Sequence, residues 1–213
     1  MLIHPHDAAL SDDEWRDFLA THDFGQVIAP GAAIEMPVIA PTHFVFDGAN
    51  TLEMHFHRAN PVLKAIEESP RAIFSVIGSY TYIPTSWNAD PGTDPEWGVP
   101  TSYYAAVQAT TEAAIVDDPV ELAALLSRLL SHFQPEGGHY PVEAGDNPYG
   151  KLLGAIRGVR LTISSVRAKF KFGNNKSSAQ RLDIAERLER RASGLDLEAR
   201  EHLLRRLREG SRR

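Results

Sequence analysis

The sequence predicts an α+β protein built on an antiparallel β-barrel, with peripheral helices and further helices at its C-terminal end. Six or so stretches of the 213-residue chain are β-branched and apolar, or alternate between polar and apolar positions, as strands do. Short turns join most of these stretches, whereas consecutive parallel strands would need a helical crossover between them. Regularly spaced leucines near the end of the chain indicate helices that follow the barrel.

Capping and turn residues mark the predicted elements in the first half of the chain. Ser11-Asp12-Asp13-Glu14 is a capping box before apolar residues at helical spacing, which predicts a helix from 12 to about 22. Asn60 is a good N-cap and Pro61 suits a first helical position, so a short helix is expected over 61–68. Turn sequences at Pro30-Gly31 and at 47–50 separate strands. The predicted strands are 24–29, 35–46, 51–57 and 71–78, the last with a continuation over 79–83 after a bend.

The second half begins with a segment, 84–100, that holds four prolines and is typical of a loop. A strand is expected over 101–116, and the clearest helix, with a stripe of five leucines, over 119–133. The other predicted elements are a loop over 135–148, a helix over 149–156, a strand over 159–172 with a phase slip at Ser164-Ser165 that suggests a bulge, and helices over 177–191 and 195–209. We therefore expect two domains, a barrel over 1–176 and a basic helical extension over 177–213.

Composition excludes several classes of protein. The chain has no cysteine, so disulfides, thiolate catalysis and cysteine-based metal sites are ruled out. No apolar run approaches the ~18 residues of a membrane span. The first ten residues lack the apolar core of a signal peptide, so the cytoplasm is the expected compartment.

Charge is distributed unevenly along the chain. Residues 1–150 hold 5 Lys and Arg against 21 Asp and Glu, whereas residues 151–213 hold 17 against 7. Such a basic end can contact nucleic acid through phosphates. The alternative is an amphipathic helical extension that docks on an acidic body, and the regular leucines and interspersed acids of this segment favour it. No helix-turn-helix or RNA-binding signature is present.

The most informative stretch is the junction between the strand ending at His57 and the helix beginning at Pro61. Two of the 5 cations of residues 1–150, Arg58 and Lys64, lie here. The start of a helix offers free N–H groups and a partial positive charge, both of which suit a phosphate. The junction therefore indicates an anionic ligand held by Arg58, Lys64 and the backbone near Ala59 and Asn60. The alternative is a surface turn in which Arg58 pairs with a nearby carboxylate.

Two further motifs admit a functional and a structural interpretation. On the strand ending at Phe172, Lys169 and Lys171 fall on one face and two phenylalanines on the other. The lysines form either a cationic wall toward a ligand or partner subunit, or the protection of an edge strand. Ser102 and Tyr103 begin a strand and could hydrogen-bond to and stack on a flat ring, although ordinary strand propensity also explains them.

Histidines are the remaining candidates for chemistry. His55 and His57 share one face of a strand, and His43 could pair with His57 from a neighbouring strand. No third ligand stands at a recognisable spacing, so a metal site is disfavoured. A G-x-S-x-G elbow is also absent, which leaves nucleophilic hydrolysis without support.

An ordered set of motifs resembles the PaiB-like FMN-binding negative transcriptional regulators. The motifs follow the order of that family across roughly residues 1–190, and the stretch 31–36 departs from its best-known members. They are Pro41-Thr42-His43, His55 to Lys64, Tyr82 to Trp87, Val99 to Tyr103 with Ala106-Val107, and Ala168 to Lys171 with Asn174-Asn175-Lys176. The resemblance implies a split-barrel, flavin-reductase-like fold and a homodimer with FMN at the subunit interface.

The resemblance also implies roles for individual residues. Arg58 and Lys64 would hold the FMN phosphate with Ala59, Asn60 and the helix start. The ribityl chain and ring would be surrounded by Thr42, His43, His57, Ser102 and Tyr103, and Lys169 and Lys171 would reach in from the partner chain. No residue stands out as an acid–base catalyst, so any redox chemistry would belong to the flavin.

Three functions remain open from the sequence. The first is a regulator or repressor that binds and senses flavin, with DNA contact through the basic C-terminal segment. The second is an FMN-dependent oxidoreductase of the same fold, a flavin reductase or an oxidase. The third is haem binding through His43, His55 or His57.

Overall fold

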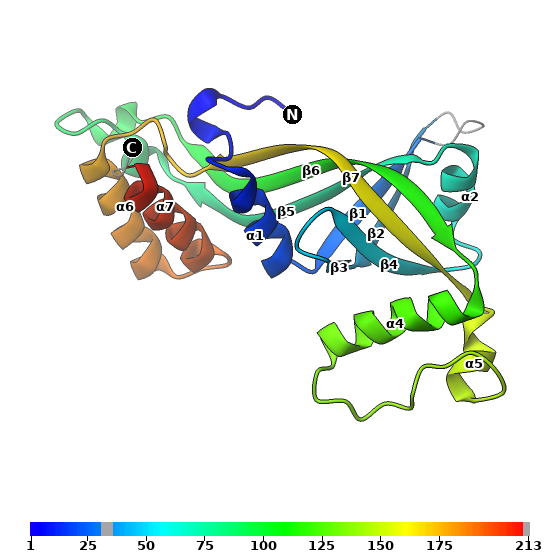
Figure 1. The fold of residues 1–213 in the computed structure, drawn as a ribbon. Coiled ribbons are helices and arrows are strands. Elements are labelled where there is room, and N and C mark those ends of the chain that lie inside the picture. The colour runs from blue at the N-terminus through cyan, green and yellow to red at the C-terminus, as the bar shows by residue number, and fades with distance from the viewer. Residues whose placement is uncertain (31–35, 211–213) are drawn as a thin grey trace. The chain divides into compact units, whose positions relative to one another are not determined.

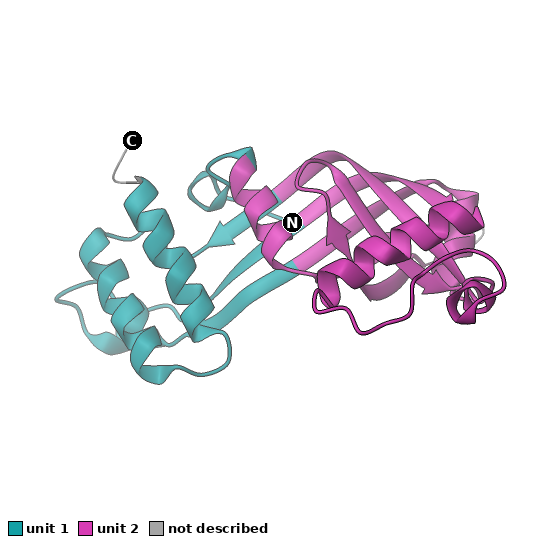
Figure 2. Cartoon of the chain, turned by 60° about the horizontal axis from the view of Figure 1, so that its bottom comes forward, with its two compact units in different colours: residues 1–12, 77–107, 168–213 teal, residues 13–76, 108–167 magenta. Residues whose placement is uncertain are grey.

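The computed structural model describes residues 1–30 and 36–210, which form two compact units. Unit 1 consists of residues 1–12, 77–107 and 168–213, and unit 2 of residues 13–76 and 108–167 (Figure 2). Compact units are defined by contacts and not by independent folding, so the expected domain boundary after residue 176 stays a prediction. Gly31 of the predicted turn, the strand start at Glu35 and residues 31–35 of the atypical stretch 31–36 lie outside the described range.

Seven strands form one antiparallel sheet, which confirms the predicted α+β class and the split-barrel fold (Figure 1). The order across the sheet is β2-β1-β5-β6-β7-β4-β3. The strands are β1 (Phe24–Ala29), β2 (Val38–His43), β3 (Val45–Phe46), β4 (Thr51–His57), β5 (Arg71–Ile83), β6 (Thr101–Val116) and β7 (Ile156–Lys171).

In unit 2 the sheet curls until its two ends meet. β2 and β3 stand at opposite ends of the strand order, yet only Phe44 separates them in the chain. The predicted single strand over 35–46 is therefore wrong, because the chain leaves one end of the sheet and joins the other at Phe44. β2 also lies against β4, and the buried side chain of Phe44 packs edge-on against Phe74. Leu52, Met54 and Phe56 are buried on one face of β4, which places the alternate residues His55 and His57 on the other face. The barrel is therefore closed where β2 runs into β3.

Four helices accompany these strands. They are α1 (Asp12–Thr21), α2 (Pro61–Glu68), α4 (Pro119–Phe133) and α5 (Pro148–Leu153). Three of them match the predicted ranges to within one residue. The predicted helix over 149–156 is wrong at its end, because Ile156 already pairs with His57 as the first residue of β7. The carbonyl of Ala155 accepts the backbone N–H of Arg58 at 2.8 Å, so the chain is committed to sheet pairing directly after Gly154.

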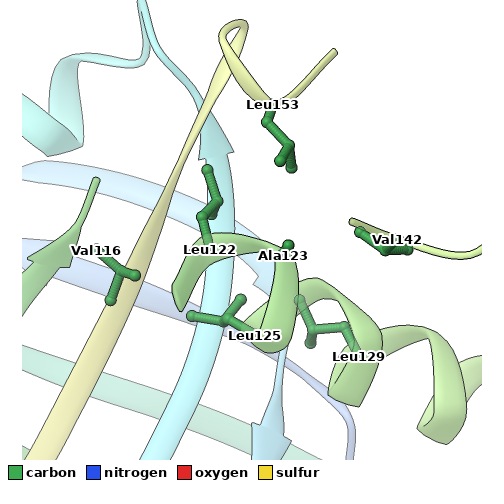
Figure 3. Close-up of a cluster of buried hydrophobic side chains, with 7 residues drawn as sticks. All are labelled: Val116, Leu122, Ala123, Leu125, Leu129, Val142 and Leu153. Atoms are coloured by element: carbon green, nitrogen blue, oxygen red, sulfur yellow. The ribbon is translucent and has the colours of Figure 1, made fainter. Parts of the chain in front are cut away.

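Helix α4 covers a second apolar cluster outside the barrel (Figure 3). Leu122, Leu125 and Leu129 of α4 are buried against residues of the segment that follows, including Val142 and Leu153. A buried carboxylate also ties α4 to the barrel: Glu53 of β4 accepts from Arg128 of α4 at 2.6 and 2.9 Å and from Arg160 of β7 at 3.0 Å. Burial alone would raise the pKa of Glu53, but these two arginines hold it below its ordinary value.

Unit 1 contains the ends of the long strands and the C-terminal helices. The predicted bend in β5 lies at Ser79, whose backbone has a φ of +54°. The predicted loop 84–100 contains two short helical segments, α3 (Thr85–Asn88) and η2 (Pro95–Trp97), and a third, η1 (Pro5–Asp7), lies near the N-terminus. In η2 the Asp94 carboxylate accepts the Glu96 N–H at 2.9 Å, a capping bond that the proline-rich pattern did not reveal.

The C-terminal helices α6 (Ser178–Arg191) and α7 (Asp196–Gly210) lie against each other. Both agree with the predicted ranges to within one residue, and Ser177 is the N-cap of α6. β7 begins three residues before the predicted start at 159. Its buried positions change from Val159 and Leu161 to Ala168 and Phe170, which confirms the predicted phase slip. In the described part of the chain, no helix combines the length and apolar character needed to traverse a bilayer.

Candidate functional site

The junction between β4 and α2 is a tightly bonded turn. Asn60 is the N-cap of α2, and its Oδ1 accepts the Val62 N–H at 3.0 Å. The Asn60 N–H donates to the carbonyl of His57 at 2.8 Å, and the Ala59 N–H donates to Nδ1 of His57 at 3.2 Å. The backbone N–H groups that the sequence assigned to an anion are therefore used within the turn. Anion binding at this place has to come from side chains.

Arg58 is held in place by main-chain carbonyls. Its Nε donates to the carbonyl of Gly154 at 3.0 Å, and its Nη2 lies 3.5 Å from the carbonyl of Ile156. The side chain is 51% exposed, and Nη1 makes no hydrogen bond to a described residue. The guanidinium is thus oriented at the turn and keeps donors toward solvent.

The carboxylate that Arg58 approaches, Asp117, is hydrogen-bonded mainly to another arginine, Arg157. Asp117 lies 3.9 Å from Nη2 of Arg58, whereas Arg157 donates to it through Nε at 2.7 Å and through Nη2. The Arg157 hydrogen bonds hold the pKa of Asp117 below its ordinary value, with a smaller contribution from the charge of Arg58. The alternative interpretation was that Arg58 pairs with a carboxylate at a surface turn. Arg58 makes only a long contact with Asp117, a carboxylate that also accepts hydrogen bonds from Arg157.

Lys64 is the second cation of the junction. It is the fourth residue of α2, and its side chain is 76% exposed and lies 3.8 Å from Glu68. Val62, Leu63 and Ile66 bury the opposite side of this helix. The helix is therefore fixed by its apolar side while the ammonium group stays in solvent.

The histidines pair differently from the prediction. The ring of His43 lies 5.3 Å from that of His55 and 5.0 Å from that of Phe133. The predicted His43–His57 pair is wrong, because His57 is exposed and its Nδ1 accepts the Ala59 N–H. Burial and the nearby His43 lower the pKa of His55, whose Nδ1 is buried without a hydrogen-bond partner. Among residues 1–30 and 36–210, no three His, Cys, Asp or Glu side chains are arranged to hold a metal ion.

Thr42 and two of the predicted site residues of unit 1, Lys169 and Lys171, make hydrogen bonds within the chain. The buried Thr42 donates to the carbonyl of its neighbour His43 at 3.0 Å. Lys169 is buried, donates to the Leu2 carbonyl at 3.1 Å and lies 5.4 Å from the centre of the Tyr104 ring. Lys171 donates to the hydroxyl of Thr101 at 2.6 Å.

Ser102 and Tyr103 differ sharply in exposure. Ser102 is half-buried, whereas Tyr103 is only 1% exposed and packs edge-on against Phe172. The structure thus brings together Arg58, Ala59, Asn60, Lys64 and His57 in unit 2. It places Ser102, Tyr103, Lys169 and Lys171 in unit 1.

Comparison with known proteins identifies the family. Residues 1–165 match the family model FMN_bind_2, described as "Putative FMN-binding domain". The chain belongs to this family. It is an FMN-binding protein of the split-barrel type, and FMN is its cofactor. No curated protein sequence matches it.

Solved structures share the fold at low identity. The flavocytochrome Anf3 of Azotobacter vinelandii is 15% identical, with 81% of this chain and 73% of that chain covered and a TM-score of 0.60. The FAD- and haem-binding protein of Mycobacterium smegmatis is 19% identical, with 88% and 80% covered and a TM-score of 0.57. The conserved hypothetical protein Rv2991 of Mycobacterium tuberculosis is 15% identical, with 84% and 99% covered and a TM-score of 0.54.

Sequence reasoning missed the groups that orient Arg58. The Gly154 and Ile156 carbonyls are 96 and 98 residues away, and Arg157 bridges Asp117 and Glu67 beside them. No local pattern marks a main-chain carbonyl as a partner. The one available signal was the concentration of acids and cations around a capped strand–helix turn.

Proposed function

We propose that this protein is a dimeric flavin-sensing regulator of the PaiB-like type, in which Arg58 and Lys64 hold the phosphate of FMN. The observation that carries the proposal is Arg58, fixed by two carbonyls at the β4–α2 turn with donors directed to solvent. Lys64 supplies a second exposed cation in the first turn of α2. Two cations beside a capped helix start match the charge and oxygen acceptors of a phosphate.

Other residues are assigned to FMN by position and chemistry. Ala59 and Asn60 shape the turn, and their N–H groups already bond to His57. Thr42, His43 and His57 are the candidates from unit 2 for the ribityl chain and ring. Ser102, Tyr103, Lys169 and Lys171 stay a prediction for the same role, to be tested one by one. Bound FMN supplies a reversible redox group, while the chain binds and orients it.

Replacement of Arg58 by glutamine is expected to weaken FMN binding by about 10- to 100-fold, because one charge-assisted contact to phosphate is lost. Quenching of flavin fluorescence on titration measures the dissociation constant. Arg71→Gln, at an exposed cation that starts β5, is the matched control and should leave it unchanged. Equal affinity for the Arg58 and Arg71 variants would place the phosphate elsewhere.

The dimer is supported by an apolar row on three adjacent strands of unit 2. Ile28 of β1 lies opposite Ile39 of β2 and opposite Ile73 of β5. Ile39 and Ile73 are exposed, and Phe24 on the same strand as Ile28 is exposed as well. An uninterrupted apolar row on a sheet face is typical of an interface with another protein surface. The proposal assigns it to a second copy of the chain.

The double replacement Ile39→Glu and Ile73→Glu is therefore expected to convert the dimer to a monomer, because four charges would have to be desolvated in one interface. Light scattering after gel filtration measures the mass. Leu182→Glu, at an exposed leucine of α6, is the control that should stay dimeric. If the unmodified protein has the mass of a monomer in this measurement, the proposed dimer is wrong.

Regulation requires contact with DNA, and exposed arginines of the C-terminal helices are the residues to test. Arg206 is buried and donates to the carbonyls of His6 and Ala8 and to Asn174, so it serves the fold. Arg190 of α6 and Arg208 of α7 are exposed. The double variant Arg190→Glu and Arg208→Glu should abolish salt-sensitive retention on DNA. Retention that the double variant leaves intact would contradict DNA binding through this segment.

A second candidate is an enzyme of the same fold, favoured by one structural neighbour that is a flavocytochrome. Consumption of NAD(P)H with added FMN would support it, and no consumption across substrates supports the sensing module. Haem binding is favoured by the His43–His55 pair and the unpartnered Nδ1 of His55. A Soret band that His55→Ala removes would establish it, and an unchanged spectrum after haem addition would exclude it.

A further inference from the structure

A turn after β7 gathers polar groups in the interior of unit 1. Oδ1 of Asn174 lies 3.4 Å from Nη2 of Arg181 and 3.2 Å from Nε of Arg206, both of which donate to it. Its Nδ2 donates to the buried carboxylate of Asp7 at 3.3 Å and to the Phe170 carbonyl at 2.6 Å. Asp7, which lies in η1, thus accepts from the amide of Asn174 and makes no ion pair with Arg181.

Arg181 is a buried charge without a carboxylate partner among the described residues. It is 7% exposed, and its Nη2 also donates to the carbonyl of Leu203 at 3.0 Å. Its Nε is buried and has no hydrogen-bond partner. Burial and the charge of Arg206 lower its pKa. Because an uncompensated buried cation is costly, this position favours a bound negative charge.

The hydroxyl of Tyr103 is the second unpartnered group at this turn. It is buried without a hydrogen-bond partner. A Cβ built on Gly173 would stand 2.2 Å from it, which places the hydroxyl against the turn that Asn174 continues. Burial raises the pKa of Tyr103 to about 12; the charge of Arg181 opposes this increase and the charge of Asp7 adds to it, so the phenol is neutral and able to donate.

We propose that Nε of Arg181 and the hydroxyl of Tyr103 bind one small monovalent inorganic anion of the chloride class inside unit 1. Both groups are donors, so the ligand must accept from both. A water molecule would satisfy the hydrogen bonds but not the charge of the guanidinium. Both donor atoms are buried, which favours an ion small enough to be enclosed in the interior of unit 1. The site belongs to unit 1, whereas the residues proposed for the FMN phosphate belong to unit 2.

The first test compares unfolding temperatures in sodium chloride and sodium gluconate at equal ionic strength and pH, with FMN saturating. Chloride should raise the midpoint of the unmodified protein by about 3 °C or more, because an ion that binds the folded state stabilises it. Arg181→Met and Tyr103→Phe should remove this difference, and Arg190→Met, an exposed arginine of the same helix, should keep it. Equal midpoints in the two salts, or a chloride effect that survives in Arg181→Met, would overturn the proposal.

Crystals grown in bromide decide the matter if the Arg181 variant does not fold. An anomalous peak within hydrogen-bonding distance of both Arg181 Nε and the Tyr103 hydroxyl is the expected result. Water density without anomalous signal at that position would show that the two groups are solvated and not ion-binding.

Discussion

Replacement of Asp196 by alanine is expected to lower the free energy of unfolding by about 3 kcal/mol. Asp196 is 1% exposed and is the first residue of α7. Arg191, the last residue of α6, donates to both of its oxygens at 2.7 Å. The Ser193 N–H at 3.0 Å and the hydroxyl of Thr81 complete its partners.

The cost is high because the change removes one charge of a buried, fully bonded group. Arg191 would keep only the Thr81 hydroxyl, the Tyr82 carbonyl and the Trp87 ring, over which it lies at 4.6 Å. Urea denaturation followed by circular dichroism measures the change. Asp183→Ala, which breaks a partly exposed pair with Arg187 one helical turn away, should cost about 0.5 kcal/mol or less. Similar losses for both variants would contradict the burial argument.

The same carboxylate gives a definite pH dependence. The hydrogen bonds from Arg191, with smaller contributions from Thr81 and Ser193, lower the pKa of Asp196 from 3.8 to about 2. A lowered pKa means that the unfolded chain binds this proton first as pH falls. The contribution is therefore complete above about pH 4 and is lost between about pH 4 and pH 2. Stability curves of the unmodified protein and Asp196→Ala should converge in that window and run parallel above it.

Replacement of Gly173 by alanine is expected to cost about 3 kcal/mol, from backbone strain and from overlap. Gly173 has a φ of +67°, where an L-residue is strained. The added Cβ would also lie 2.2 Å from the hydroxyl of Tyr103. Because Tyr103 is buried against Phe172, its ring cannot swing away without moving the core of unit 1.

A matched glycine separates the two causes. Gly194 has a φ of +55° but no atom near its added Cβ, so Gly194→Ala should cost only the strain, about 1 kcal/mol. Adding Tyr103→Phe to Gly173→Ala should recover part of the loss, since the hydroxyl is the atom in closest overlap. Equal losses of unfolding free energy for the two glycine variants would mean that the Tyr103 hydroxyl moves away from the added Cβ without cost.

Local signals were enough to predict the longer helices and most of the strands of this fold. Asn60, Asp118 and Ser177 each accept a backbone N–H at the start of a helix whose beginning the sequence had placed to within one residue. Capping and strand alternation act over a few residues, so a sequence displays them directly. The end of α5 was misjudged because Ile156 is held by pairing with a strand 99 residues earlier in the chain.

The sequence predicted which segment carries the candidate site, but not how the side chains and N–H groups of that segment are bonded. The cations Arg58 and Lys64 and the capped turn could be read from adjacent residues. Whether the N–H groups of Ala59 and Asn60 were free depended on His57, whose ring folds back to bond one of them. The choice of His55 over His57 as the partner of His43 depended on how the barrel closes.

The sequence by itself determined the strands, the helices and the position of the cationic turn, because those features rest on contacts between near neighbours. Only the tertiary structure decided which polar groups keep donors for a ligand and which are consumed inside the chain. Arg58 and Arg206 are the same type of residue, yet the side chain of Arg58 is held at the surface and that of Arg206 is buried. That difference arises from strand register and helix packing between residues that lie up to 200 positions apart, and no local pattern encodes it.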